Sequence, residues 1–278
     1  MEYPELPRVY FPSSFSSKHR RLVGENRFIL RSLREWWLDT VILAKQARAW
    51  LAARPRGIIL FLLATAAATF VLMLVDLTLL RWIQLGESGE AQQFLHKLAR
   101  SLSYWGDFLG FNMIVFGGLG FVALRYRSLF FRRLTLAAVI GTLVCGGVAN
   151  VSRLVTGRGR PAYPEMAGFH GPSFRSCQQS FPSAHTATSF GASVPVAVAM
   201  PPVGVPLLIV SAGVSWSRME NNRHHPSDVF VSICLSLLVG VPLGVVVRRM
   251  RSVELQRRRT SSTTSDQLDL APLNPSTT

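Results

Sequence analysis

Uncharged, mostly apolar stretches alternate with short basic segments along most of this chain. Four of them, at 57–80, 108–124, 134–152 and 229–247, are 17 to 24 residues long, and Asp76 is the only charged residue within them. A helix of about 20 residues crosses the apolar core of a bilayer, which is about 30 Å thick. Each stretch is therefore predicted to be a membrane-spanning helix.

A fifth uncharged run, residues 186–217, is too long for one perpendicular crossing. As one helix, its 32 residues would reach about 48 Å at a rise of 1.5 Å per residue. Pro201-Pro202 lies in the middle of the run, and proline ends or kinks a helix. We therefore predict two short helices joined at the prolines. The chain is then an all-α, polytopic membrane protein with six transmembrane helices.

The charge distribution favours this class over a soluble nucleic-acid-binding protein. The chain has 278 residues, 49% of them hydrophobic, and a formal net charge of +15. The basic residues lie between apolar runs, so we expect membrane lipids and no nucleic acid as partners. The three cysteines, Cys145, Cys177 and Cys234, have no paired spacing, which indicates neither a disulfide framework nor a metal cluster.

The positions of the basic residues predict the orientation. With six spans, 21 of the 30 lysines and arginines fall on one side, in residues 1–56, 125–133 and 248–278. Lysine and arginine favour the cytoplasmic side, so both termini are expected there. We expect a multi-pass protein of a bacterial cytoplasmic membrane. The side of the protein opposite to its termini then faces the periplasm or the exterior.

The ends of the chain are expected to differ from the membrane domain at 57–247. In the arm 1–56, residues 28–51 form one helical stripe of apolar residues: Leu30, Leu33, Trp37, Val41 and Ala44. This pattern is typical of an amphipathic helix on the cytoplasmic surface, and an ordinary helix packed on the spans fits it equally well. The segment 92–105 is expected to lie at the interface. The cytoplasmic tail 248–278 is basic and then rich in Ser, Thr and Pro, so we expect disorder from residue 260 onward.

Three short segments at the ends of the apolar runs carry the candidate chemistry. They are Arg153-(6)-Arg160-Pro161, Pro182-Ser183-Ala184-His185 and Ser217-Arg218-(5)-His224-(3)-Asp228. In the six-span arrangement all three face the extracytoplasmic side. Phosphoryl transfer needs positive charge around the equatorial oxygens, together with a nucleophile and an acid. Three guanidiniums, two imidazoles, a hydroxyl and a carboxylate provide these groups, so we predict phosphoryl transfer at the membrane interface.

The two histidines allow more than one interpretation. Asp228 follows His224 by one helical turn and would orient its ring, which leaves the other nitrogen free to attack. His185 would then protonate the leaving oxygen. The histidines could instead bind a metal ion, but Glu220 is the only further acidic residue near them in sequence, and metal binding is the weaker hypothesis. No role is predicted for His225, and Arg158 is interpreted as a surface or supporting charge.

The three segments resemble the signature of the type-2 phosphatidic acid phosphatase family. That signature reads Lys-(6)-Arg-Pro, Pro-Ser-Gly-His and Ser-Arg-(5)-His-(3)-Asp, and every spacing in this chain agrees with it, in the same order. The family includes membrane lipid phosphatases and soluble vanadium haloperoxidases. The resemblance covers residues from about 57 to 247 and implies the six-helix fold of the membrane members.

The resemblance also implies a role for each site residue. His224 would be the nucleophile that forms a phosphohistidine, Asp228 would orient it, and His185 would protonate the leaving group and then activate water. With no metal and no cofactor, the phosphate would be held by Arg153, Arg160, Arg218, Ser183 and the backbone N–H of Ala184. Two positions depart from the signature. Arg153 replaces lysine and keeps the charge, whereas Ala184 replaces glycine and would be strained if the backbone needed a positive φ.

The predicted function is hydrolysis of a lipid phosphomonoester or diphosphate. The candidate substrates are lipid A, a polyprenyl diphosphate, phosphatidylglycerol phosphate and phosphatidic acid. A lipid phosphotransferase would use the same intermediate and is the main alternative. A non-catalytic transporter or scaffold is disfavoured because His185, His224 and Asp228 are all present. A haloperoxidase is disfavoured because the haloperoxidases of the family are soluble. The sequence does not indicate an oligomeric state.

Overall fold

The chain folds into a bundle of helices. The computed structural model describes residues 25–84, 89–106 and 108–269, and these ranges contain no β-strand. The helices are α1 (Glu25–Ala52), α2 (Pro55–Gln84), α3 (Glu90–Trp105), η1 (Phe108–Asn112), α4 (Met113–Arg125), α5 (Leu129–Thr156), η2 (Pro164–Met166), η3 (Ser176–Gln178), α6 (Ala184–Ala199), α7 (Pro201–Glu220) and α8 (Pro226–Asp269). The predicted all-α class is therefore confirmed.

Three described helices are long and apolar enough to cross a membrane. They are α2, α5 and the part of α8 from Pro226 to Gln256. A fourth candidate is the pair Gln92–Trp105 and Leu109–Arg125, if these two segments, bent by 59°, form one broken span. α6 has only 16 residues and α7 has 20. Length and composition thus support three or four spans, and the count of six stays a prediction.

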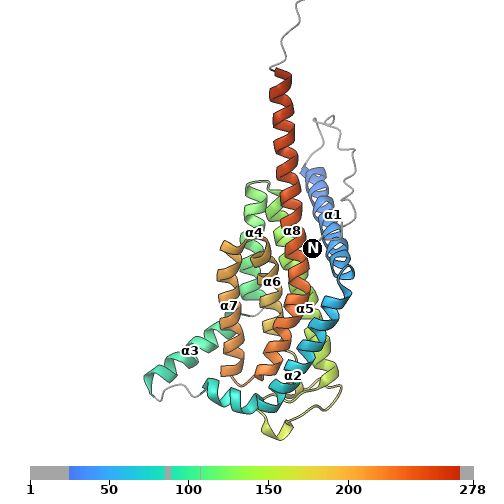
Figure 1. Cartoon of the computed structure of the whole chain (residues 1–278). Helices are drawn as coiled ribbons and strands as arrows, with labels where there is room; N and C mark the ends of the chain where they lie inside the picture. The colour runs from blue at the N-terminus through green and yellow to red at the C-terminus, as the bar shows by residue number, and fades with distance from the viewer. Residues whose placement is uncertain (1–24, 85–88, 107, 270–278) are drawn as a thin grey trace, which may run out of the picture.

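The long uncharged run is divided where the sequence predicts. α6 ends at Ala199 and α7 begins at Pro201, so the two helices meet at the proline pair. Proline has no backbone N–H group. It suits the first position of a helix, because an N–H at that position would have no hydrogen-bond partner within the helix. The two helices run back along each other, and the two ends of the run therefore lie at the same end of the bundle (Figure 1).

The centre of the bundle is α6, which packs against α5, α7 and α8. α5 and α6 approach each other closely at Gly141 and Gly191. A Cβ atom added to Gly141 would lie 2.2 Å from the carbonyl oxygen of Gly191. Small residues let two helix backbones come this close in an apolar environment, where tight packing replaces the hydrophobic effect as the main attraction between helices.

α1 packs on the bundle along α5 and α8. Leu43 and Ala47 are buried in the main apolar cluster, and Asp39 is 2.6 Å from an Nη atom of Arg132. Two residues of the predicted apolar stripe, Leu33 and Trp37, are instead exposed. The helix expected from the pattern is therefore present. It is attached to the spans by a second face that the stripe did not indicate.

Two other segments extend beyond the bundle in Figure 1. α3 projects to one side, contacts α7 and leaves Phe94, Tyr104 and Trp105 exposed, as an interfacial helix would. α8 continues past the predicted domain boundary at residue 247 and is helical through Asp269. No glycine or proline occurs between Gly244 and Pro272, so nothing in the sequence stops the helix at residue 260, where we expected disorder to begin. Residues 270–278 and 1–24 of the predicted tail and arm lie outside the described residues.

We expect Gly141→Ala to lower the free energy of unfolding by about 1–3 kcal/mol, because its methyl group would force α5 and α6 apart. Gly147 lies on the same helix and has no atom within 4 Å of an added Cβ, so Gly147→Ala should be neutral or stabilising. Thermal unfolding of the two purified variants in the same detergent measures the difference. Equal stability of the variants would contradict the close contact at Gly141.

Candidate active site

All three motif segments lie at one end of the bundle, where four helix ends meet (Figure 1). α5 ends with Arg153 in its last turn, and α6 begins directly after Ser183. α7 ends with Arg218 in its last turn, the following turn contains His224, and Asp228 lies in the first turn of α8. The structure therefore brings the predicted site residues together, and the loop 157–183 closes this end of the bundle.

The loop begins at Gly157, which ends α5 in a left-handed conformation. Its φ is 55°, and an added Cβ would lie 1.9 Å from the carbonyl oxygen of Gly171. Glycine alone suits both conditions. Farther along, the backbone N–H of Arg160 donates to the carbonyl oxygen of Cys177 at 2.8 Å, and that of Ser180 donates to Arg158 at 3.0 Å. The loop is thus held in place by its own backbone.

The N-terminus of α6 supplies part of the site. Ser183 is its fully buried N-cap residue, and the hydroxyl of Ser183 accepts a hydrogen bond from Thr186 Oγ1 at 3.1 Å. Backbone N–H groups of a first helical turn have no partner within the helix, and they favour an anion nearby. Ala184 is the first residue of α6 and does not have a positive φ. The strain considered for alanine in place of glycine therefore does not arise.

Arginine side chains from different elements lie at the same end of the bundle as this helix start. Arg153 Nη2 donates to Asn150 Oδ1, and Arg218 Nη1 donates to Ser103 Oγ. Burial, with the nearby charges of Arg153 and Arg223, lowers the pKa of the Arg160 guanidinium. Like charges repel, so an anion bound among these groups would stabilise the arrangement.

His224 is fully buried, and its two ring nitrogens have different surroundings. Nδ1 lies 2.7 Å from the carbonyl oxygen of Ser180, which can only accept, so Nδ1 carries the proton. Nε2 has no hydrogen-bond partner among the described residues. Burial lowers the pKa of His224 to about 4, so the ring is neutral near pH 7 and Nε2 has a free electron pair. A ring in this state can act as a nucleophile.

Asp228 lies beside this ring, but its main contacts are with other groups. Its Oδ2 atom is 3.7 Å from His224 Nδ1, too far for a good hydrogen bond, so the Ser180 carbonyl is the closer orienting group. The Asp228 carboxylate accepts from Arg158 Nη1 at 2.5 Å, Ser180 Oγ at 2.5 Å and the backbone N–H of His225 at 2.8 Å. Arg158 is 7% exposed, so it is a buried supporting charge and not a surface one.

Asp76 also belongs to this region, although none of the motifs indicated it. Asp76 belongs to α2 and is 3% exposed, and its Oδ2 atom lies 2.7 Å from Arg158 Nη2. It also accepts from the backbone N–H of Ser227 at 2.9 Å and from Ser227 Oγ at 2.5 Å. Its position as the only charge in a long apolar run was the available signal, because a charge within a membrane segment requires a partner.

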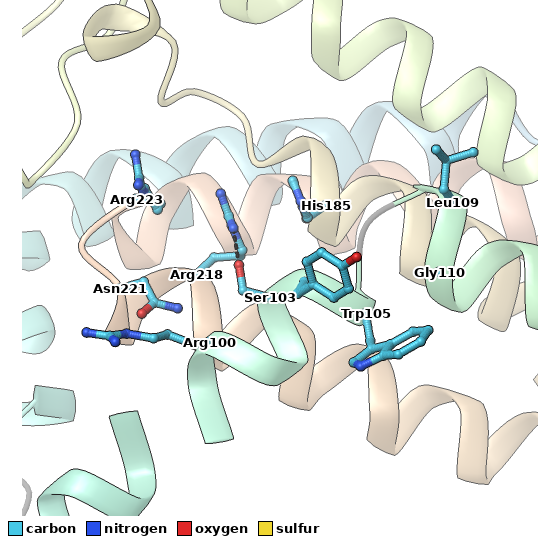
Figure 2. A pocket seen from close by; sticks show the side chains of 10 residues that line it. Arg100, Ser103, Trp105, Leu109, Gly110, His185, Arg218, Asn221 and Arg223 are labelled. Atoms are coloured by element: carbon cyan, nitrogen blue, oxygen red, sulfur yellow. Dashed lines mark hydrogen bonds between the residues drawn. The ribbon is translucent and has the colours of Figure 1, made fainter. Parts of the chain in front are cut away.

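A cavity of about 750 Å³ opens beside the predicted phosphate site (Figure 2). His185 and Arg218 line it together with three residues that the motifs did not indicate, Arg100, Ser103 and Arg223. Its other lining residues are Tyr104, Trp105, Leu109, Gly110 and Asn221. The cavity therefore combines basic groups with exposed aromatic and apolar side chains of α3 and η1. Within the described ranges, no group of three or more His, Cys, Asp or Glu side chains is placed to hold a metal ion.

Comparisons with known proteins bear on the resemblance of the three segments. A family model described as the PAP2 superfamily matches residues 113–251, half of the chain, and this range includes all three motif segments. A comparison with curated proteins finds no match. Among solved structures, the crystal structure of Aquifex aeolicus LpxE is similar at 20% sequence identity and a TM-score of 0.43, covering 63% of this chain and 95% of that one. On the family match, the chain belongs to the PAP2 superfamily.

Proposed function

We propose that this protein is a lipid phosphatase that works through a phosphohistidine on His224 and needs no metal ion. The observation that carries the proposal is the state of the His224 ring. Its Nδ1–H is held by the Ser180 carbonyl, its Nε2 atom has no partner among the described residues, and two motif arginines, Arg160 and Arg218, lie near enough to act on its charge. Membership in the PAP2 superfamily supports a phosphatase, since the three motif segments lie in the matched range.

The proposed reaction has two steps. In the first, Nε2 of His224 attacks phosphorus and the bond from phosphorus to the lipid oxygen breaks, while His185 gives a proton to that oxygen. In the second, His185 takes a proton from water, the water oxygen attacks phosphorus, and the phosphorus–nitrogen bond breaks to release phosphate. Arg153, Arg160 and Arg218 offset the charge of the equatorial oxygens in both steps.

The lining of the cavity supports a lipid with more than one anionic group. A single phosphate can be met by the three motif arginines, and Arg100 and Arg223 are additional cations at the same cavity. Tyr104, Trp105 and Leu109 are exposed beside them, where the apolar part of a lipid would begin. A lipid diphosphate, lipid A or phosphatidylglycerol phosphate carries a second phosphate for these arginines, and phosphatidic acid does not.

Phosphate release by the purified protein across these four lipids tests the proposal. We expect kcat/KM to be about tenfold higher for the lipids with two phosphates than for phosphatidic acid, because one contact with a charged group contributes about 1.5 kcal/mol or more. Arg223→Gln should reduce that preference, whereas Arg175→Gln, an exposed loop arginine that does not line the cavity, should not. A chelator should leave every rate unchanged.

Several outcomes of this assay would contradict the proposal. Loss of activity in the chelator with recovery on adding one divalent ion would contradict metal independence. Radiolabelled phosphate that appears on a second lipid instead of in solution would identify a phosphotransferase. An equal rate on phosphatidic acid would contradict the role of the additional arginines.

His224→Ala is expected to abolish turnover and phosphoenzyme formation, whereas His225→Ala should keep most of the activity. His225 bonds Asp228 chiefly through its backbone N–H, at 2.8 Å, and alanine retains this group. Trapping of acid-labile phosphoenzyme with labelled substrate distinguishes the two variants. Equal loss in both would show that the nucleophile is assigned incorrectly or that the His225 ring is required.

We also propose that the site faces away from the cytoplasm in a multi-pass protein whose termini are both cytoplasmic. The support is the excess of basic residues in the segments assigned to the cytoplasm, 21 of 30. Phe174, at the motif end, and Tyr126, at the other end of α5, are both exposed. In a Cys177→Ser background, an impermeant thiol reagent should label Phe174→Cys and not Tyr126→Cys in intact cells. The reverse pattern would overturn this orientation.

A further inference from the structure

The Arg158 guanidinium is held between two carboxylates from separate helices. Its Nη1 atom donates to Asp228 Oδ1 at 2.5 Å and to Ser227 Oγ at 2.7 Å, and its Nη2 atom donates to Asp76 Oδ2 at 2.7 Å. Asp76, Arg158 and Asp228 are 3%, 7% and 0% exposed. We call these three residues the buried charge relay.

We propose that the buried charge relay is a positioning device for the nucleophile, in which Asp76 holds Arg158 and Arg158 sets the place and the effective charge of Asp228 beside His224. The inference rests on the proposed function of His224. It adds Asp76 and Arg158, neither of which belongs to the motif residues, and Asp76 lies outside the range that the family model matches.

Charge balance explains why two carboxylates are present. One guanidinium between two carboxylates leaves a net charge of −1 in a buried region, and such a charge is costly unless a cation joins it. Attack through Nε2 gives an imidazole ring that carries a phosphoryl group on one nitrogen and a proton on the other, so the ring gains positive charge. Asp228 Oδ2, 3.7 Å from His224 Nδ1, then faces that charge. The negative charge of the buried charge relay is therefore best balanced in the phosphoenzyme, where the phosphorylated His224 ring is positive.

The arginine also limits the negative charge that His224 experiences before the reaction. A bare carboxylate beside the ring would favour the imidazolium form, which has no free electron pair to attack phosphorus. Because Arg158 binds Asp228, the carboxylate favours the imidazolium form of His224 less strongly. Burial of the His224 ring then keeps it neutral. The other charged groups that face His224 are Arg160 and Arg218. Their positive charges also lower the pKa of the His224 ring.

Aromatic rings and further hydrogen bonds surround Arg158 and its carboxylate partners. The aromatic rings of Phe169 and Phe181 have their centres 5.3 and 5.9 Å from the guanidinium carbon, a distance at which cations are attracted to ring faces. Asp76 also binds the backbone N–H and hydroxyl of Ser227, which precedes Asp228. α2 is thereby joined to the first turn of α8, so a shift of α2 would move the carboxylate beside the nucleophile.

The test compares Arg158→Gln, Arg158→Lys and Asp76→Asn with Asp39→Asn as a matched control. Asp39 forms buried ion pairs with Arg132 and Arg133 in the α1–α5 contact, away from the motif residues. The measurements are the titration of His224 by NMR of labelled histidines, assigned with His224→Ala, and kcat, KM and their pH dependence per folded molecule. The NMR titration does not depend on turnover, so it tests the relay even if no lipid is hydrolysed.

Arg158→Gln should raise the pKa of His224 by about one unit, because the charge of Asp228 is then uncompensated. Its kcat should fall by about 30-fold or more, with KM changed less than about threefold. Asp76→Asn should not raise that pKa, since Arg158 then acts on Asp228 alone, and its kcat should fall by about tenfold. Arg158→Lys should leave the pKa near that of the parent protein and lower kcat. Asp39→Asn should change neither.

An unchanged titration in Arg158→Gln would overturn the proposal. So would an equal rise in Arg158→Gln and Asp76→Asn, because a site merely opened to water would raise the pKa of His224 in both. If Arg158→Gln does not fold, Arg158→Lys and Asp76→Asn decide the matter: both must lower kcat without raising the pKa of His224. Full activity in either variant would contradict the relay. The proposed function fails separately, if the parent protein releases phosphate from no lipid and forms no phosphoenzyme.

Discussion

The contact on which this structure most depends is the single guanidinium of Arg158 between two buried carboxylates. It joins α2, the loop after α5 and the first turn of α8 at the end of the bundle where the motif residues meet. Loss of Arg158 would leave two buried carboxylates without a counter-charge, so both carboxylates depend on this one guanidinium. The same contact that orders these elements therefore also sets the electrostatic surroundings of His224.

The rest of the site has an excess of positive charge in a small space. Arg153, Arg160 and Arg218 come from different elements, and Arg100 and Arg223 add to them at the cavity. The N-terminus of α6 contributes partial positive charge without a titratable group. Such an arrangement is unfavourable when empty and favourable with a phosphate bound, so the site supports anion binding whichever lipid supplies the phosphate. The exposed aromatic residues of α3 give the cavity an apolar border suited to a lipid.

Several features were predictable because they depend on local chemistry. The break at Pro201 follows from proline geometry, and it lets the two ends of the long uncharged run lie at one end of the bundle. The motif spacings determined the family, and the order of apolar runs determined the helical class. The state of His224 was not predictable in the same way. One helical turn placed Asp228 close to the ring, but the Ser180 carbonyl, 44 residues away in sequence, makes the shorter contact.

The sequence by itself determined the helices, their division at the prolines, the motif residues and the family, because these depend on residue type and on spacing along one chain. Only the tertiary structure decided that Arg158 is buried and that Asp76 reaches it from another helix. It also decided that Leu33 and Trp37 of α1 are exposed while Asp39 and Leu43 face the bundle. These outcomes depend on which helices pack together. Packing of that kind is set by contacts between residues far apart in sequence, and no local period or motif encodes them.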